Sequence, residues 1–471
     1  MSIPTSVLDR LRNIVGPQGY VDAPADIEPF TVDHRKLYRG VTPLVLKPSD
    51  TQQVSDILKV CYEAGVGVVP VGGNTGYCGA ATPSADGSQV VLSLGRMRRI
   101  RSVDPDNYTL VAEAGCVLAE VQTAAESVDR LFPLSLGSEG SCQIGGNLST
   151  NAGGTAVLRY GMMRDLVLGL EVVLPDGRIW DGIKPLRKDN TGYDLRDLFI
   201  GAEGTLGVIT AAACKLFSRP RERITALVAV PDPQAAVSLL SQLRTTSGDA
   251  VTTFELMPRL ALELVWRHIP KSVNPFDETY EWYLLVEISV GRQGTDTRAF
   301  VEEELARALE ADRIYNAAIA QSESQRESFW RLRETIPEGQ RTEGASIKHD
   351  ISVTTSELPR FIEECSALLK QIAPEARIIP YGHMGDGNLH FNLSAPVQGD
   401  TQMFLALAPR IHRAVHDLVA QYGGSISAEH GIGQLKRADL VRYKSPVAID
   451  IMRSIKAALD PKGIMNPGKV L

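Results

Sequence analysis

Two short stretches of the chain hold residue types that bind metal ions. The first, YGHMGDGNLHFNL at residues 381–393, contains His383 and His390. Further along, SAEHGIG places Glu429 directly before His430, next to glycines. Histidines and a glutamate that converge are typical of a zinc site with an open position for a substrate oxygen. A lone histidine is more often a core or surface residue, so this prediction depends on both stretches together.

The pattern after the first histidine predicts how its neighbours are placed. Gly-Asp-Gly turns the chain, and LHFNL then alternates apolar and polar residues as a strand does. With a period of two, the three apolar residues of LHFNL face a core. His390 and Asn392 then lie side by side on the opposite face, and His383 can fold back toward His390.

Three glycine-rich segments form a second group of candidate residues. PVGGNTGYCGAATP (70–83) follows a short buried strand, and the others lie at 137–154 and 201–210. Such loops let the backbone approach a ligand and offer N–H groups to an anion, although any one alone is more simply a turn.

Two other nucleotide-binding motifs are absent from the sequence. No G-x-G-x-x-G lies between a strand and a helix, and the match of Gly463–Lys469 to a phosphate loop lacks a Ser or Thr and a following helix. Neither a nicotinamide site nor a phosphate loop is therefore predicted.

In order and spacing, the three segments resemble the FAD-binding domain of the vanillyl-alcohol oxidase family, in the branch that holds D-lactate and D-2-hydroxyglutarate dehydrogenases. The resemblance spans essentially the whole chain and includes Asn466, which begins the motif NPGK near its end. It implies an α+β fold, with a two-part FAD-binding domain of that type. The second part it implies is an α+β substrate (cap) domain with an antiparallel sheet.

The resemblance implies that FAD is bound by all three segments. The first loop would hold the pyrophosphate, the second the ribityl chain and ring, and the third the adenine half. Asn74 excludes a histidine link in the first loop, and Cys142 is interpreted as a small buried residue, so the FAD is expected to be non-covalent. The implied cofactor-binding residues are Gly72, Gly73, Asn74, Thr75, Gly76, Ser141, Ile144, Gly145, Gly146, Asn147, Thr150, Asn151, Gly153, Gly154, Glu203, Gly204, Gly207, Ile209 and Asn466.

The resemblance also implies roles for the metal-binding stretches. His383, His390 and Glu429 match the ligands of Zn²⁺ or another divalent metal. Asn392 matches a substrate contact, and His430 matches the catalytic base, which also touches the substrate. A Lewis-acidic metal lowers the pKa of the substrate hydroxyl, a neutral histidine takes its proton, and hydride passes to the flavin.

A further set of residues would hold the far end of the substrate. In dicarboxylate-specific relatives an Arg, a Thr and a Lys bind the distal carboxylate, and Arg333 and Lys348 match two of these. The Thr position falls on Pro337, which removes one hydroxyl donor and weakens the hydroxyglutarate assignment. For Arg333 the alternative is a solvated helix face shared with Arg331.

These residues predict an FAD-dependent, metal-assisted dehydrogenase that oxidises an (R)-2-hydroxy acid to the 2-oxo acid. The expected substrate is a dicarboxylate such as D-2-hydroxyglutarate or D-malate, with D-lactate or glycolate as the alternative. Two other classes of protein are possible: a flavin subunit of a multi-subunit oxidase, and a zinc hydrolase with a vestigial nucleotide fold. A subunit that only carries flavin would need none of the histidines His383, His390 and His430. An electron-transfer flavoprotein or a quinone is the expected electron acceptor, and a homodimer is common in the family.

The elements that must position these residues divide the chain into three parts. Apolar spacing predicts a helix over 51–64, capped by Thr51, among short strands. The pattern changes at SRPRE, after which strands and helices of an α+β domain follow. A final amphipathic helix and tail are too short for a core of their own. The predicted parts are an FAD-binding domain at 1–218, a substrate/cap domain at 219–423, and a C-terminal segment at 424–471 that packs back on the FAD domain.

Composition narrows the class of protein further. Among 471 residues, 49 Lys plus Arg against 56 Asp plus Glu give a net charge of −7, and no basic patch for nucleic acid is present. No apolar run approaches the ~18 residues that span a bilayer, and the first residues lack a secretion signal. Six scattered cysteines without a CxxC pair indicate a reduced, cytoplasmic compartment. His412 and His416 lack an acid that would complete a zinc site, so they are interpreted as helix-surface residues.

Overall fold

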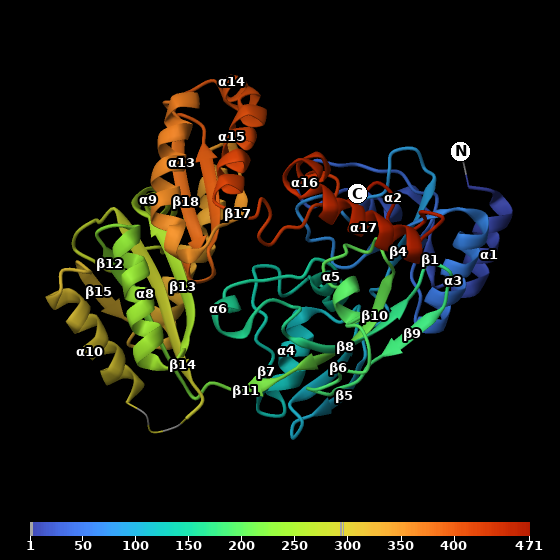
Figure 1. The fold of residues 1–471 in the computed structure, drawn as a ribbon, viewed down its shortest axis with the longest axis horizontal. Helices are drawn as coiled ribbons and strands as arrows, with labels where there is room; N and C mark the ends of the chain where they lie inside the picture. Colours follow the sequence, from blue (N-terminus) through green and yellow to red (C-terminus); the bar gives the residue numbers. More distant parts are fainter. Residues whose placement is uncertain (1–2, 293, 295) are drawn as a thin grey trace. The chain divides into compact units, whose positions relative to one another are not determined.

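The computed structural model describes residues 3–292, 294 and 296–471, and these form two compact units. Figure 1 shows the chain, coloured from the N-terminus to the C-terminus. The units interleave along the sequence, so neither is one continuous stretch. Unit 1 contains Met1–Gly153, Gly161–Arg219 and Glu429–Leu471, and unit 2 contains Gly154–Tyr160 and Pro220–Ala428.

This division differs from the sequence-based boundaries at three places. The segment 154–160, which includes α6 (Val157–Tyr160), belongs to unit 2. Arg219 belongs to unit 1, and unit 2 continues to Ala428 rather than to 423. Hydrogen bonds explain the first difference, because the hydroxyl of Thr253 donates to the carbonyl of Thr155 over 3.1 Å. No sequence pattern predicts a hydrogen bond between two residues so far apart along the chain.

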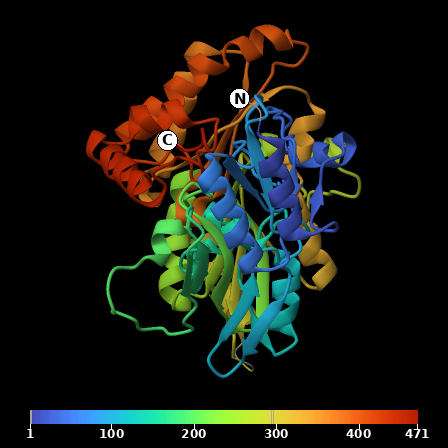
Figure 2. The same cartoon turned by 90° about the vertical axis from the view of Figure 1, so that its right-hand side faces the viewer.

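The first sheet of unit 1 has the strand order β1-β2-β4-β3 and mixes parallel and antiparallel pairs. Helices α1 and α3, the blue helices in Figure 2, lie side by side and bury apolar residues against this sheet. The elements of this part are α1 (Thr5–Val15), β1 (Tyr20–Val21), α2 (Pro24–Ile27), η1 (Glu28–Phe30), β2 (Val45–Leu46), α3 (Thr51–Ala64), β3 (Gly67–Val71) and β4 (Gln89–Ser93).

Helix α3 has the predicted bounds but not the predicted cap. The residue before it, Asp50, accepts a hydrogen bond from the backbone N–H of Gln53 over 2.9 Å and so caps the helix. The prediction of Thr51 as the cap is wrong, because the hydroxyl of Thr51 instead donates to Glu171 over 2.6 Å. Thr51 therefore ties α3 to the second sheet of the unit.

That second sheet is antiparallel, with the order β5-β6-β10-β8-β9. The C-terminal segment returns to unit 1, where Asn466 N–H donates to the carbonyl of Val68 on β3 over 2.8 Å. The remaining elements of unit 1 are β5 (Ile100–Asp104), β6 (Thr109–Glu113), α4 (Leu118–Glu126), β7 (Arg130–Leu131), α5 (Ile144–Ser149), β8 (Val167–Val173), β9 (Ile179–Gly182), α7 (Arg196–Phe199), β10 (Val208–Lys215), β11 (Phe217–Ser218), α16 (Arg437–Tyr443) and α17 (Pro446–Leu459).

Unit 2 is built on one sheet with the order β15-β12-β14-β13-β18-β19-β16, and β17 also pairs with β19. Every pair recorded among its described strands is antiparallel, which confirms the predicted α+β domain with an antiparallel sheet. Its strands are β12 (Glu222–Val230), β13 (Val251–Pro258), β14 (Trp282–Val290), β15 (Asn316–Ile319), β16 (Ser346–Ile347), β17 (Asp350–Ser352), β18 (Arg377–His383) and β19 (Asn388–Ser394).

Helices flank this sheet, and α13 and α15 lie side by side next to β18 in Figure 1. Apolar side chains of α9, α11 and the central strands form its main core. The helices are α8 (Pro233–Ser247), α9 (Arg259–His268), α10 (Thr297–Glu310), α11 (Glu323–Glu334), α12 (Ile336–Thr342), η2 (Thr355–Glu357), α13 (Leu358–Ile372), η3 (Met384–Asp386), α14 (Thr401–Ala406) and α15 (Ala408–Gln421).

The two histidines of α15 are not helix-surface residues, so that prediction is wrong. His416 is buried, and Nδ1 of His412 lies 2.9 Å from Nε2 of the buried His349. Both face inward because α15 packs its amphipathic face against the unit. A spacing of four along a helix shows that two side chains share a face, but not which face is covered.

Candidate functional site

A pocket in unit 1 lies where the glycine-rich segments meet. The space inside it, including the part open to solvent, is about 1020 Å³. Its lining includes most of the residues assigned to FAD from the sequence. These are Gly72, Gly73, Asn74, Thr75, Gly76, Gly145, Gly146, Asn147, Thr150, Glu203, Gly204, Gly207, Ile209 and Asn466.

Some assigned residues lie elsewhere, and some lining residues were missed. Ser141, Ile144, Asn151, Gly153 and Gly154 are not among the described residues that line the pocket. Ile144 is fully buried, so it belongs to the core of α5 rather than to its wall. The missed lining residues include Asp33, Tyr77, Cys78, Ala114 and Gln143, none of which has a pattern of its own in the sequence.

The glycines around the pocket are required for two different reasons. A Cβ at Gly73 would lie 2.1 Å from the carbonyl oxygen of Ser141, so this position is glycine because two backbone segments touch. A Cβ at Gly146 would meet nothing within 4 Å, although Gly146 sits in helix α5 and lines the pocket. Gly146 therefore keeps space open for a ligand rather than for the protein itself.

Three buried amide oxygens of the pocket have no hydrogen-bond partner among the described residues. They belong to Gln143, Asn147 and Asn466. Buried polar atoms are nearly always paired, so these oxygens indicate a bound group that donates hydrogen bonds. The hydroxyls of a ribityl chain and the N–H of a flavin ring are donors of this kind. The residues present therefore fit FAD.

The C-terminal segment closes one side of the same pocket. The carboxylate of Glu203 accepts hydrogen bonds from the N–H groups of Ile432 and Gly433, at 2.7 and 2.8 Å. Burial raises the pKa of Glu203, and these two N–H groups oppose the shift. Asn466 donates to the carbonyl of Glu203 over 2.7 Å. Glu203 thus holds the chain near His430 as well as lining the pocket.

His430, the predicted base, lines this pocket together with the glycine loops. Its ring packs edge-on against Tyr77, with centroids 4.7 Å apart, and Tyr77 follows directly after Gly76 of the first loop. The ring of Tyr77 also packs edge-on against His34, with centroids 5.6 Å apart. The imidazole is therefore placed beside the cofactor site by aromatic packing within unit 1.

In unit 2, the turn between β18 and β19 brings two predicted metal ligands together. The ring centroids of His383 and His390 are 5.8 Å apart. Leu389, Phe391 and Leu393 are fully buried, as the period of two predicts. His390 and Asn392 therefore share the other face of β19.

A buried carboxylate that the sequence reasoning missed lies behind His383. Glu255 on β13 is opposite His383 in the strand register, and its Oε1 lies 2.6 Å from Nδ1 of His383. Its Oε2 accepts a hydrogen bond from Nε of Arg333, also over 2.6 Å. Burial raises the pKa of Glu255, but the charges of His383 and Arg333 outweigh it and lower this pKa to about 2. The signal that could have found it is a lone acid within the apolar strand VTTFELMP.

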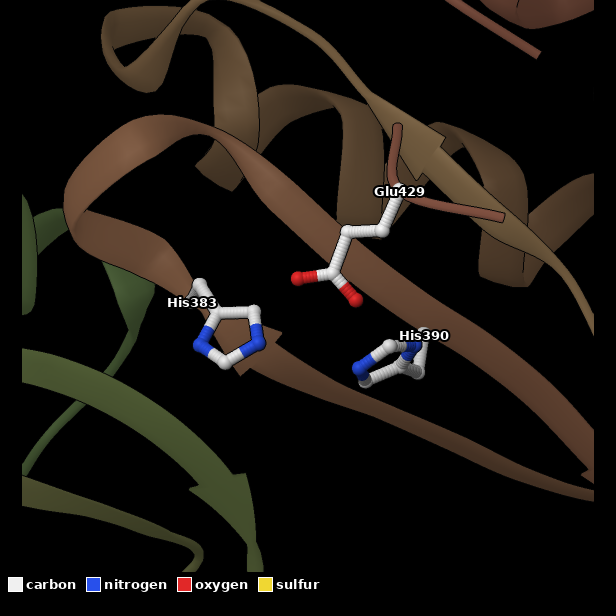
Figure 3. A group of neighbouring side chains, drawn as sticks. All are labelled: His383, His390 and Glu429. Carbon is white, nitrogen blue, oxygen red and sulfur yellow. The ribbon is translucent and has the colours of Figure 1, made fainter. Parts of the chain in front are cut away.

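The third predicted ligand, Glu429, directly follows Ala428, the last residue of unit 2. Ligand atoms of His383, His390 and Glu429 all lie within 4.8 Å of one another, and Figure 3 shows the three side chains. Two imidazoles and one carboxylate at this spacing suit zinc or another divalent ion. The donor set therefore fits the group that the resemblance implies.

The residues predicted to bind the substrate have different surroundings. Arg333 at the end of α11 is only 7% exposed, whereas Arg331 is exposed, so the solvated helix face proposed for both is wrong for Arg333. The guanidinium of Arg333 also lies over the ring of Tyr381, 5.0 Å from its centroid. Lys348 is exposed between β16 and β17, and Pro337 is the second residue of α12.

Asn392, the other predicted substrate contact, takes part in a buried network. Its Nδ2 donates to Oε1 of Gln340 over 3.0 Å, and its Oδ1 accepts from the backbone N–H of His349 over 3.3 Å. These bonds fix the amide of Asn392 beside His390. Sequence reasoning could not find Gln340, because α12 carries no pattern that relates it to β19.

Leucine at Gly146 is expected to block FAD without unfolding the protein. The new side chain projects into the pocket, and leucine favours a helix over glycine by about 1 kcal/mol. We expect the apoprotein to keep or raise its Tm, while the Kd for FAD in a fluorescence titration rises more than about tenfold, or about 1.4 kcal/mol. Gly137→Leu is the control, because a Cβ there also meets nothing within 4 Å but Gly137 does not line the pocket. Equal FAD affinity in both variants would contradict this view of Gly146.

Comparison with known proteins agrees with the fold and the pocket. The family model described as FAD binding domain matches residues 42–182, and the model described as FAD linked oxidases, C-terminal domain, matches residues 219–470. Among solved structures, p-cresol methylhydroxylase superposes with a TM-score of 0.76 at 15% identity, covering 99% of this chain and 96% of that one. The fold and pocket thus define a flavoprotein of the vanillyl-alcohol oxidase type.

Two curated relatives narrow the class of flavoprotein to which the chain belongs. A mitochondrial D-2-hydroxyglutarate dehydrogenase of Arabidopsis thaliana is 38% identical over 470 residues, which cover 100% of this chain and 82% of that protein. A Schizosaccharomyces pombe protein, provisionally named a mitochondrial D-lactate dehydrogenase, is 37% identical over 477 residues, covering 97% and 88%. The chain belongs to the family of FAD-linked oxidases, in the branch of D-2-hydroxyglutarate and D-lactate dehydrogenases. It is an FAD-dependent oxidoreductase.

The expected cytoplasmic compartment is contradicted by these relatives, whose names place them in mitochondria. None of the six cysteines, all of which the structure describes, forms a disulfide, as expected, but reduced cysteines argue only against an oxidising compartment. They do not distinguish one reducing compartment from another. None of the helices in the described part of the chain has both the length and the apolar composition needed to cross a bilayer.

Proposed function

We propose that the protein oxidises the D-isomer of a 2-hydroxy dicarboxylate, D-2-hydroxyglutarate or D-malate, to the 2-oxo acid. The observation that carries this proposal is the position of His430. It lines the pocket of the glycine loops in a chain whose relatives include a D-2-hydroxyglutarate dehydrogenase. A base beside a flavin suits the removal of a hydroxyl proton during oxidation.

The proposal includes a divalent metal, most simply zinc, held by His383, His390 and Glu429. Their ligand atoms lie within 4.8 Å of one another, which supports a shared ion. The hydrogen bond from Nδ1 of His383 to Glu255 is the arrangement in which a histidine presents Nε2 to a metal. A non-catalytic flavin subunit would not need such a metal-binding cluster, and a zinc hydrolase would not need the flavin pocket. Both rival classes therefore have less support than the dehydrogenase.

When bound, the flavin accepts the hydride from C2 of the substrate and the metal acts as a Lewis acid on the adjacent hydroxyl. The chain supplies the remaining functions. His430 takes the hydroxyl proton on a ring nitrogen, Asn392 donates to the substrate, and Arg333 with Lys348 binds the distal carboxylate. We expect the pocket to hold FAD without a covalent bond. Asn74 occupies the first loop, and Cys142, although it lines the pocket, is buried with its thiol pKa raised by burial, which lowers its reactivity.

D-lactate or glycolate is the second candidate substrate, and two observations favour it. Pro337 supplies no hydroxyl where dicarboxylate-specific relatives have a threonine. Nε of Arg333 is already bound to Glu255, so this side chain is not wholly available to a substrate. We further propose an electron-transfer flavoprotein or a quinone as the electron acceptor, and a homodimer as the assembly.

A panel of D- and L-2-hydroxy acids with an artificial dye acceptor tests the proposal. We expect the largest kcat/KM for D-2-hydroxyglutarate or D-malate, lower values for D-lactate and glycolate, and none for the L-isomers. Bleaching of the flavin absorbance when substrate is added without a dye provides an independent measure. A preference for D-lactate would establish the second candidate instead.

The variant Arg333→Lys tests whether Arg333 recognises the distal carboxylate. Alanine is unsuitable, because it would remove one of the two charged partners of the buried Glu255 and so destabilise the fold itself. A lysine keeps the charge but has one compact ammonium, which cannot serve Glu255 and a carboxylate in the way a planar guanidinium does. We expect KM for dicarboxylates to rise about tenfold or more, while KM for D-lactate changes little.

Arg331→Lys is the matched control, because Arg331 lies two residues earlier on the same helix and is exposed. It should leave both KM values unchanged. An equal rise in KM for both acids in the Arg333 variant would mean that Arg333 is structural, and would remove the support for a dicarboxylate.

A further inference from the structure

Glu255 is a buried acid in the middle of an apolar strand. It lies on β13, between Phe254 and Leu256, and all three residues are at most 1% exposed. A carboxylate is rarely buried so completely unless it is paired and hydrogen-bonded. Its position therefore needs a reason other than the packing of the sheet.

The contacts of Glu255 give that reason. Each carboxylate oxygen bonds a different functional side chain: Oε1 lies 2.6 Å from Nδ1 of His383, and Oε2 accepts from Nε of Arg333 over 2.6 Å. His383 is directly opposite Glu255 in the register of β13 and β18. Arg333 reaches Glu255 from the end of α11, so one carboxylate joins a strand turn to a helix.

The first bond orients His383. A neutral imidazole that donates from Nδ1 carries its lone pair on Nε2, and a carboxylate partner at Nδ1 is the usual way to fix a metal-binding histidine. Figure 3 shows the ring of His383 facing the ring of His390. A His383 without this partner could rotate or change tautomer, and Nε2 would then no longer be held for an ion.

The second bond orients and neutralises Arg333. Holding Nε fixes the plane of the guanidinium over Tyr381, and with it the direction of the two terminal nitrogens. The negative charge of Glu255 also balances the positive charge of Arg333. Without that balance, a guanidinium near His383 would disfavour a divalent cation.

We propose that Glu255 is a positioning residue that joins the metal ligand His383 and the substrate anchor Arg333 in one hydrogen-bonded unit. This inference rests on the proposed function, since it presupposes a metal at His383. It goes further, because it assigns two effects to the carboxylate of Glu255. The carboxylate supports metal binding by His383, and it sets the direction of the Arg333 guanidinium. Loss of Glu255 therefore affects both the metal affinity at His383 and the orientation of Arg333, although these two residues lie on separate elements.

The first experiment measures metal affinity in Glu255→Gln. Glutamine has one oxygen and one amide group, so it cannot accept from both His383 and Arg333. We expect the zinc Kd, measured by competition with a chromogenic chelator on FAD-loaded protein, to rise about 10–100-fold, the usual effect of losing such a partner. Zinc per chain, measured by elemental analysis after dialysis, should fall in parallel.

Glu287→Gln is the matched control for the loss of a buried carboxylate. Glu287 lies on the neighbouring strand β14 and is also buried, but its Oε2 accepts hydrogen bonds from Thr225, Arg326 and Trp330. It should retain the zinc affinity of the original protein. A loss of zinc affinity as large as that of Glu255→Gln would show a general effect of destabilising the sheet, and would overturn the inference.

A split of kinetic effects completes the test. In Glu255→Gln, KM should rise more for dicarboxylates than for D-lactate, and adding excess zinc should restore kcat without restoring this selectivity. If Glu255→Gln does not fold, Glu255→Asp replaces it; its carboxylate is one methylene shorter, so a smaller loss of zinc affinity is expected. Unchanged zinc affinity in the folded variant overturns the inference. Absence of zinc binding in the original protein instead overturns the metal site of the proposed function.

Discussion

His430→Ala is expected to lower kcat by about 10²–10⁴, the usual contribution of a positioned proton acceptor. The FAD content should stay near that of the original protein, because the pocket keeps its glycine loops and its three amide oxygens. The acidic limb of the kcat/KM profile should disappear, since that limb reports protonation of the base in the free enzyme. Stopped-flow measurement of flavin reduction would show whether the loss lies in the chemical step.

His34→Ala is the control for the aromatic packing around His430. His34 also packs against Tyr77 and is exposed, but it does not line the pocket. Its replacement should leave kcat within about twofold. If His430→Ala instead loses metal, and added zinc restores part of the rate, His430 is a ligand rather than the base.

Removing the metal is expected to abolish turnover while the flavin remains bound. The flavin pocket is lined by residues of unit 1, whereas His383 ends β18 and His390 lies on β19, both in unit 2. Dialysis against a chelator should therefore eliminate dye reduction without changing the flavin absorbance spectrum. Added zinc should restore the rate, because the ligands themselves are intact.

His390→Ala provides the matching test with the ligand removed. Its activity should fall to the level of the chelated protein, and added zinc should not restore it. His412→Ala, which removes a histidine of unit 2 outside the cluster, should respond to the chelator as the original protein does. Full activity in a sample shown by elemental analysis to lack metal would exclude this role for the cluster.

Local patterns determined much of the fold and the nature of the site. The period of two in LHFNL correctly predicted that Leu389, Phe391 and Leu393 are buried, because alternation in a strand depends only on neighbouring residues. It did not predict that Asn392, on the other face, is buried as well. The glycine-rich segments indicated an FAD pocket, because glycine is the default residue where the backbone comes close to a ligand. The bounds of α3 also followed from apolar spacing, but its cap did not, because Asp50 and Thr51 are both good caps by type.

Tertiary structure decided which of the candidate side chains meet and which are paired with one another. The sequence leaves a solvated helix face as the alternative to a substrate anchor for Arg333, and only its burial and its bond to Glu255 exclude that alternative. The sequence by itself determined residue types and the faces they share along one element. Only the folded chain brought Glu255 opposite His383 and Tyr77 against His430, because those contacts depend on strand register and on segments far apart in the sequence.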